Sequence, residues 1–90
     1  MPTVQIKIYG EVQGVFFRAT AKSVAARLGI KGWIKNTREG NVEAVIDGDE
    51  KAVEEFIAWC GHGPDKSIVT KVDVGTVPPA SFNEFIIIRP

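Results

Sequence analysis

The chain begins with a strict alternation of apolar and polar residues. Residues 4–10 read Val-Gln-Ile-Lys-Ile-Tyr-Gly, and a period of two predicts a strand with one buried face. Alternating or mostly apolar patterns predict four further strands, at residues 30–35, 41–47, 67–74 and 82–89. The turn ending at Gly40 predicts that the second and third strands pair as a hairpin. Pro78 and Pro79 separate the last two strands, because proline cannot donate to a sheet ladder.

Two segments between these strands carry the spacing of amphipathic helices. The apolar face of the first consists of Phe17, Ala21, Val24, Ala25 and Leu28, and that of the second of Val53, Phe56, Ile57 and Cys60. Gly29 suits the end of the first helix, where a left-handed residue is favoured. The acidic segment 47–50 suits the start of the second. Residues 61–65, Gly-His-Gly-Pro-Asp, are predicted to form a loop.

The order of these elements predicts how they pack. It runs strand, helix, strand, strand, helix, strand, strand, so a strand–helix–strand unit occurs twice. Two such units predict an α+β protein of split βαβ type, with both helices on one face of the sheet. With 90 residues, the chain is long enough for one domain, residues 1–90, and too short for two.

Composition narrows the expected partners and location. Lys and Arg number 11 and Asp and Glu number 11, for a formal net charge of +0. Nucleic-acid binders usually show a basic excess, because phosphate neutralisation supplies much of their affinity, so no nucleic-acid partner is expected. Cys60 is the single cysteine, which rules out an internal disulfide. Neither a membrane span nor a signal peptide is apparent. We expect a monomer in a reducing cytoplasm, with no membrane partner.

The segment from Gly10 to Arg18 is the strongest candidate for chemistry. Gly10 and Gly14 allow sharp turns and close approach of the backbone to a ligand. The segment runs into a helix, whose first N–H groups and dipole favour an anion. Arg18 can hold two oxygens of a phosphate at once. Taken alone, the same pattern also fits an ordinary strand–helix connection with a solvated arginine. A nucleoside triphosphate is disfavoured, because the Gly-Lys-Ser/Thr ending of a Walker loop is missing.

Two segments resemble signatures of the acylphosphatase family. Residues 10–18 read Gly-Glu-Val-Gln-Gly-Val-Phe-Phe-Arg and are similar to its first signature. Residues 32–42 read Gly-Trp-Ile-Lys-Asn-Thr-Arg-Glu-Gly-Asn-Val and, together with Gly48, resemble its second. The resemblance extends over nearly the whole chain. It implies a ferredoxin-like sandwich, βαββαβ plus a C-terminal strand, with a mainly antiparallel sheet.

The resemblance also implies an activity and a set of site residues. The activity is metal-independent hydrolysis of a small-molecule acyl phosphate to a carboxylate and inorganic phosphate, without a cofactor. Arg18 is expected to hold the phosphate and Asn36 to orient the attacking water. The backbone cradle is expected to consist of Glu11, Val12, Gln13, Gly14, Val15 and Phe16.

The proton of the attacking water needs an acceptor. A carboxamide such as that of Asn36 can orient water by hydrogen bonding but is no base at neutral pH. The resemblance favours the substrate phosphate as acceptor, and Glu11 is a weaker candidate. Phosphoryl transfer depends mainly on positioning and charge stabilisation, which amides and an arginine can supply.

Other chemistry-bearing residues have simpler interpretations. His62, the single histidine, is expected at the surface, and Cys60 on the buried face of a helix. One cysteine and one histidine do not make a metal site. The acidic segment 47–50 lacks the other positions of a calcium loop. Lys35 and Arg38 could steer anions, but a solvated hairpin explains both.

Two other functions remain open at this point. An RNA-binding module of this fold needs exposed aromatic rings on the central strands, and residues 4–9 offer only Tyr9. A non-catalytic domain that binds a small anion would use the same cradle, and only turnover of an acyl phosphate separates it from an enzyme. Similar domains also begin larger hydrogenase-maturation proteins. Because the chain ends at Pro90, directly after its last predicted strand, a stand-alone enzyme is expected.

Overall fold

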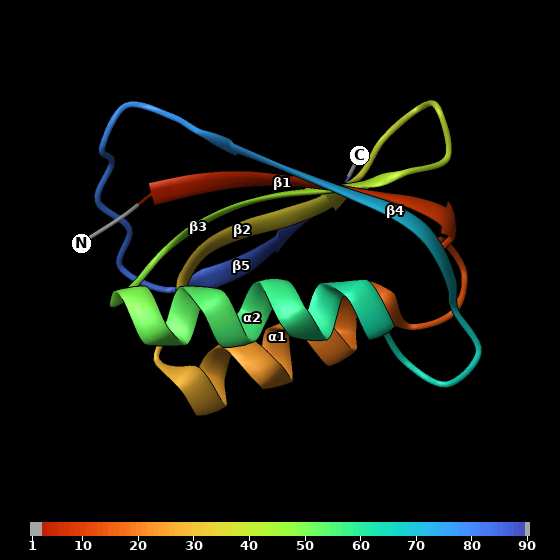
Figure 1. Ribbon diagram of the computed structural model, residues 1–90, viewed down its shortest axis with the longest axis horizontal. Coiled ribbons are helices and arrows are strands. Elements are labelled where there is room, and N and C mark those ends of the chain that lie inside the picture. Colours follow the sequence, from red (N-terminus) through yellow and green to blue (C-terminus); the bar gives the residue numbers. More distant parts are fainter. Residues whose placement is uncertain (1–2, 90) are drawn as a thin grey trace.

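The computed structural model describes residues 3–89. A five-stranded sheet in the order β4-β1-β3-β2-β5 forms one layer and two helices form the other (Figure 1). The predicted ferredoxin-like α+β fold is therefore confirmed. The elements are β1 (Thr3–Glu11), α1 (Phe17–Leu28), β2 (Lys31–Asn36), β3 (Val42–Asp47), α2 (Glu50–His62), β4 (Ile68–Thr76) and β5 (Phe85–Ile88).

The sheet is mainly antiparallel. Strand β1 pairs antiparallel with both β3 and β4, and β2 pairs antiparallel with β3 as the predicted hairpin. Strand β5 instead lies parallel to β2, with Ile34 opposite Ile87 and Lys35 opposite Ile88. The carboxyl ends of these two strands therefore lie side by side.

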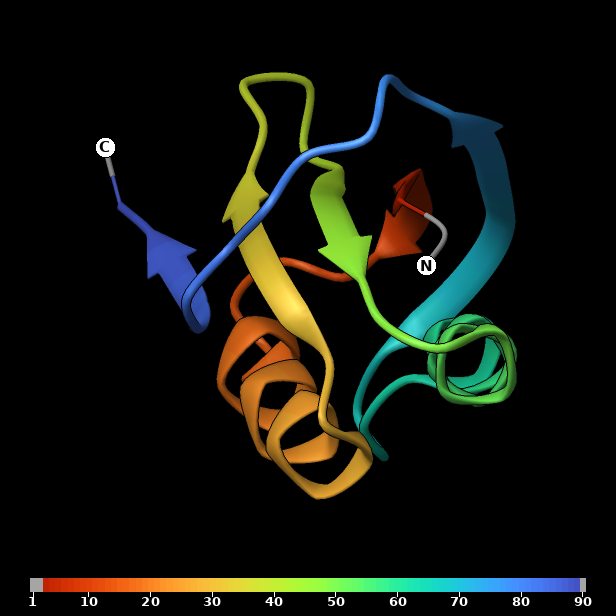
Figure 2. The ribbon, with the colours of Figure 1, turned by 90° about the vertical axis from the view of Figure 1, so that its left-hand side faces the viewer.

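Both helices cover the same face of the sheet. Figure 2 looks along α2 and shows α1 obliquely, with α1 against β2 and β5 and α2 against β1 and β4. The alternation along each strand sends its apolar residues to this face, where Ile6, Ile34 and Ile46 are fully buried. Fully burying one such side chain contributes about 1.5–3 kcal/mol. The helices add Phe17 and Phe56 to the same core, so the predicted apolar faces are confirmed.

The end of α1 and the start of α2 are formed by the residues predicted for them. Gly29 follows α1 with a φ of 71°, and its N–H is directed at the carbonyls of Ala25 and Ala26. Asp49 precedes α2, and its carboxylate accepts a hydrogen bond of 2.9 Å from the N–H of Ala52. Each contact satisfies backbone groups that a helix end leaves unpaired.

Most strand ends lie one or two residues from their predicted positions, and the differences at α2 and β5 have clear physical reasons. Helix α2 continues through His62 instead of ending before Gly61, and Gly63 ends it with a φ of 70° while donating 2.7 Å to the carbonyl of Trp59. An isolated glycine within the last turn, here Gly61, is tolerated in a helix. The last strand spans only Phe85–Ile88 and not residues 82–89. Its start is set by pairing with β2, because Gly32 donates 3.0 Å to the carbonyl of Glu84.

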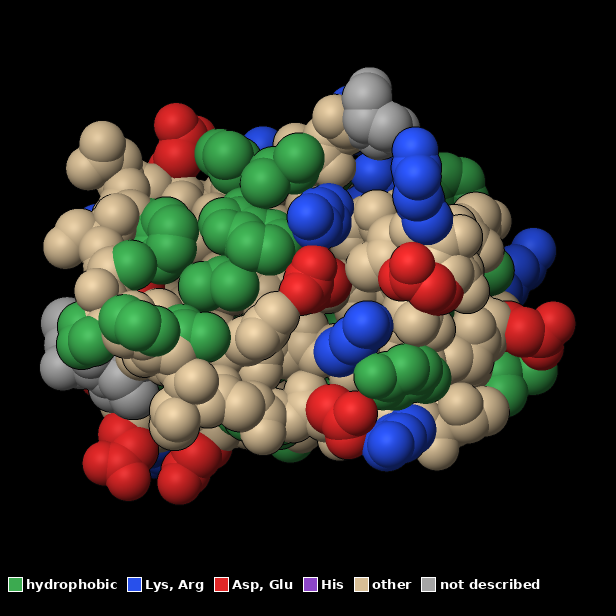
Figure 3. Space-filling model, turned by 90° about the horizontal axis from the view of Figure 1, so that it is seen from above, with side chains coloured by type: hydrophobic (Ala, Val, Ile, Leu, Met, Phe, Trp, Pro, Cys, Tyr) green, Lys and Arg blue, Asp and Glu red, His purple; other side chains and the backbone are tan. Residues whose placement is uncertain are grey.

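No helix in the described part of the chain covers the other face of the sheet. Figure 3 views this face, where many hydrophobic side chains gather on one half and charged side chains of both signs on the other. Ile86 and Ile88 of β5 are 43% and 37% exposed. Among residues 3–89, no helix is both long and apolar enough to cross a membrane.

Candidate active site

The connection between β1 and α1 curls tightly before the helix begins. Gly14 has a φ of 75° and Phe16 a φ of 61°, so both lie in the left-handed region. This conformation is a genuine outlier for a bulky residue such as Phe16, and such strain gathers at functional sites. The Phe16 carbonyl accepts hydrogen bonds from the N–H and hydroxyl of Thr20, at 3.0 and 2.8 Å. These bonds fix the loop to the first turn of α1.

The first turn of α1 is open to an anion. No side chain in the described part of the chain caps this end of the helix, and no acidic residue lies in its first turn. The first N–H groups of a helix lack partners within the helix and carry a partial positive charge. Arg18, the second residue of α1, adds a full positive charge and is half-buried. The loop and the helix start therefore present positive groups to one place.

One cavity of about 350 Å³ brings the two principal candidates together. Arg18 lines it from α1 and Asn36 lines it from the end of β2, so the two side chains lie on the same side of the molecule. Sequence-based reasoning expected this shared location, and the cavity agrees with it. The other described residues lining the cavity are Val12, Gly14, Phe16, Phe17, Ala19, Ile87 and Arg89.

The predicted cradle residues line two hollows, and Val12 lines both. Val12, Gly14 and Phe16 line the cavity with Arg18. The other three cradle residues, Glu11, Gln13 and Val15, line a separate hollow beside Gly40 and Lys66. Glu11 therefore does not reach the cavity wall, which weighs against it as a proton acceptor.

Asn36 carries an unusual polar atom. Its Oδ1 is buried and has no hydrogen-bond partner among the described residues. A buried acceptor without a partner costs about 1–3 kcal/mol, so such an atom needs an explanation. Asn36 lines the same cavity as Arg18, but this covered oxygen is not the atom that meets solvent there.

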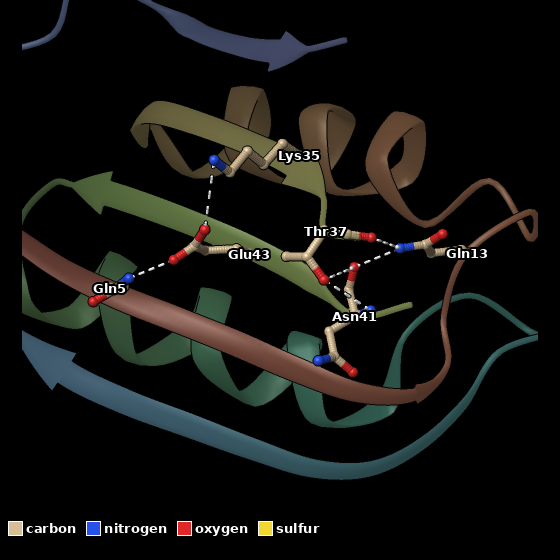
Figure 4. Close-up of polar contacts among 6 residues, drawn as sticks. All are labelled: Gln5, Gln13, Lys35, Thr37, Asn41 and Glu43. Carbon is tan, nitrogen blue, oxygen red and sulfur yellow. Dashed lines mark hydrogen bonds and ion pairs between the residues drawn. The ribbon is translucent and has the colours of Figure 1, made fainter. Parts of the chain in front are cut away.

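Gln13 ties the loop to the turn that follows Asn36. Its side-chain Nε2 donates to the carbonyls of Thr37 and Asn41, at 2.9 and 2.8 Å (Figure 4). The Thr37 hydroxyl in turn accepts 3.1 Å from the N–H of Asn41. These bonds hold the β1–α1 loop against the end of β2. Sequence reasoning gave Gln13 only a backbone role, because nothing local in the sequence shows that two distant segments meet.

Lys35 belongs to the open face of the sheet instead of the cavity. Its Nζ lies 3.8 Å from Glu43 Oε1 and 5.3 Å from the centre of the Trp33 ring. Glu43 also accepts a hydrogen bond from Gln5 (Figure 4). The carboxylate beside Lys35 offsets its positive charge, so this side chain attracts anions to the cavity only weakly. This favours its interpretation as a solvated residue of the hairpin.

Arg89 is a cavity residue that sequence reasoning missed. It follows β5 and lines the cavity together with Ile87. The one sequence feature that could have indicated Arg89 is its place two residues after Ile87, since alternate residues along a strand share a face. That signal becomes useful only once β5 is known to pair with β2, and the apolar pattern does not reveal a strand's partner.

The remaining candidates lie away from the cavity. Burial raises the pKa of the Cys60 thiol to about 12, so this side chain stays neutral and is no nucleophile near pH 7. His62 is exposed at the last turn of α2. Within residues 3–89, no three His, Cys, Asp or Glu side chains are grouped to hold a metal.

The relationship of this chain to known proteins follows from its match to a family model. The model described as Acylphosphatase matches residues 4–87. The chain belongs to the acylphosphatase family. A relative named acylphosphatase from Methylococcus capsulatus is 40% identical over 90 residues, covering 99% of this chain and 98% of that protein. Membership in the acylphosphatase family makes the chain a hydrolase and supports hydrolysis of acyl phosphates.

Solved structures of acylphosphatases share the fold. The crystal structure of acylphosphatase from Bacillus subtilis is similar to this chain with a TM-score of 0.95 and 31% identity, covering 99% of this chain and 100% of that one. HypF from T. kodakarensis matches with a TM-score of 0.86 and 26% identity, covering 100% of this chain but 12% of that one. The same architecture therefore also occurs within a much longer protein.

Proposed function

We propose that this enzyme hydrolyses the carboxyl–phosphate anhydride of small acyl phosphates by direct attack of water on phosphorus. The backbone amides of residues 11–16 and the Arg18 guanidinium hold the phosphoryl group, and Asn36 orients the water. One observation carries the proposal: Asn36, at the end of β2, lines the same cavity as Arg18, at the start of α1.

Hydrolysis of an acyl phosphate requires the protein mainly to supply positive charge and to position the reacting groups. Water oxygen forms a bond to phosphorus while the bond from phosphorus to the acyl oxygen breaks, and the electron pair leaves on the carboxylate. A carboxylate is a stable leaving group, because carboxylic acids have a pKa of about 4, so no strong acid is needed. Arg18 and the amides stabilise the charge on the phosphoryl oxygens. The water proton passes to a phosphoryl oxygen of the substrate, in line with the position of Glu11 outside the cavity wall.

The first test is phosphate release from benzoyl phosphate, with phenyl phosphate as the matched control. The enzyme should hydrolyse benzoyl phosphate well above the uncatalysed rate and leave phenyl phosphate nearly untouched, because a phenolate, with a parent pKa near 10, is a poor leaving group without an acid. Phosphate binding without turnover of benzoyl phosphate would instead identify a non-catalytic anion-binding domain.

Activity should not depend on a divalent cation. The described residues lining the cavity carry no carboxylate, thiol or imidazole, which are the side chains that usually bind metals. We therefore expect kcat/KM for benzoyl phosphate to stay within about twofold after dialysis against EDTA, since Arg18 supplies the charge that a metal would otherwise provide. A loss of activity that added Mg²⁺ or Zn²⁺ restores would overturn this account.

RNA binding is less well supported than catalysis. Strand β3, in the middle of the sheet, carries no aromatic residue. Tyr9 of β1 has Lys7 and Lys71 against its ring, at 5.9 and 5.4 Å from the centre. The stacking surface typical of sheet-based RNA readers is therefore not assembled.

Three expectations stay predictions: the monomeric state, the cytoplasmic location and the lack of a nucleic-acid partner.

A further inference from the structure

We infer that Arg89 binds an anionic group on the acyl part of the substrate, so that the enzyme prefers acyl phosphates whose acid carries a second negative charge. This inference rests on the proposed function, because it assumes that the phosphoryl group lies against Arg18 and the β1–α1 loop.

The position of Arg89 follows from the parallel pairing of β2 and β5. Lys35 lies opposite Ile88 in this pair, so the next residues along the two strands are Asn36 and Arg89. Side chains two apart on a strand share a face, and Ile87 and Arg89 both line the cavity. Ligands of α/β sheets commonly bind beyond the carboxyl ends of parallel strands. Arg89 therefore stands beside the residue proposed to orient the water.

The cavity is larger than a phosphoryl group requires. Its volume of about 350 Å³ is within the range of small-molecule pockets, roughly 300–1,000 Å³. A single water accounts for about 30 Å³ in the liquid, and a phosphoryl group has only four heavy atoms. The remaining space is lined by Phe16, Phe17 and Ile87, whose apolar surfaces suit the carbon atoms of an acyl group.

The charges along the cavity indicate what that acyl group carries. Among the described residues lining it, the charged side chains are Arg18 and Arg89, with no carboxylate beside them. Arg18 is half-buried at the helix start, whereas Arg89 is exposed. A phosphoryl group held by Arg18 at the helix start leaves Arg89, on the same cavity, available to the acyl group. A guanidinium there can form charge-assisted, bidentate hydrogen bonds to a carboxylate or a second phosphate.

The test compares a neutral with an anionic acyl phosphate. Benzoyl phosphate is the neutral substrate, and its 3-carboxy and 4-carboxy derivatives are the anionic ones, since their rigid rings keep the added carboxylate away from the phosphoryl group. In Arg89→Gln, the ratio of kcat/KM for at least one carboxylated substrate to kcat/KM for benzoyl phosphate should fall about tenfold, as loss of a charge-assisted hydrogen bond predicts. Arg89→Lys should retain part of the preference, because the charge remains but the planar fork is lost.

Arg27→Gln is the matched control. It removes the same charge from the last turn of α1, and the ratio of carboxylated to neutral turnover should not change. An unchanged ratio in Arg89→Gln for both carboxylated substrates would overturn the inference. So would an equal loss for neutral and anionic substrates together with weaker inhibition by inorganic phosphate, because Arg89 would then be part of the phosphate clamp. Failure of the wild-type enzyme to hydrolyse benzoyl phosphate at all would instead overturn the proposed function.

Discussion

Arg18→Ala should lower kcat/KM for benzoyl phosphate by about 10³-fold or more, the scale on which arginines act in phosphoryl transfer. The substitution removes the full positive charge that lines the cavity at the start of α1. Both ground-state and transition-state phosphoryl groups carry negative charge, so KM should rise and kcat should fall. Steady-state kinetics with benzoyl phosphate, together with inhibition by inorganic phosphate, measure both effects.

Two variants separate this loss from a general effect of charge or folding. Arg18→Lys should recover only part of the activity, because an ammonium cannot hold two phosphoryl oxygens in a planar fork. Arg27→Ala removes an arginine from the other end of the same helix and should leave kcat/KM within about twofold. Arg18 is half-buried and lies in the first turn, so the Arg18→Ala protein should show an unchanged circular dichroism spectrum. Near-normal kinetics in Arg18→Ala would remove the phosphate-clamp role.

Asn36→Ala should lower kcat about 10²-fold and leave the inhibition constant of inorganic phosphate nearly unchanged. Positioning a nucleophile is worth factors of this size, whereas phosphate is held by other groups. The free energy of unfolding should not decrease by more than about 1 kcal/mol, because Oδ1 of Asn36 has no partner among the described residues and its removal breaks no hydrogen bond. Kinetics and urea unfolding of the same preparation test both statements.

An equal loss of phosphate binding in Asn36→Ala would assign Asn36 to the phosphate site instead of the water. A matched control is Asn41→Ala, at the other end of the β2–β3 turn. The Asn41 carbonyl and N–H, which are backbone groups, make the recorded contacts with Gln13 and Thr37, so this variant should keep kcat within about threefold.

Local chemistry explains why much of the fold was predictable. The alternation from Val4 to Ile8 has a buried face because the helices cover one face of the sheet and leave the other open (Figure 2). Gly29 and Asp49 end and begin helices through contacts with residues a few positions away. Arg18 and Asn36 were proposed from their local motifs, and both line one cavity.

Long-range pairing explains what the sequence did not reveal. The length of β5 depends on its parallel pairing with β2. An apolar run in the sequence does not show which of its residues will pair with another strand. The same pairing brings Arg89 beside Asn36. The side chain of Gln13 contacts carbonyls 24 and 28 residues away. Such contacts depend on the arrangement of the whole sheet, so the residues near Gln13 in the sequence do not predict them.

The central claim is that one set of groups, the amides of the β1–α1 loop and the Arg18 guanidinium, holds phosphate beside Asn36. A titration of ¹⁵N-labelled enzyme with inorganic phosphate, followed by NMR, tests it most directly. The largest shifts should occur at the backbone amides of residues 11–16, the Arg18 side-chain N–H and the Asn36 carboxamide, and they should saturate together. Shifts centred on other residues, such as Lys66 and Gly40 in the neighbouring hollow, with the Arg18 signals unmoved, would contradict the account.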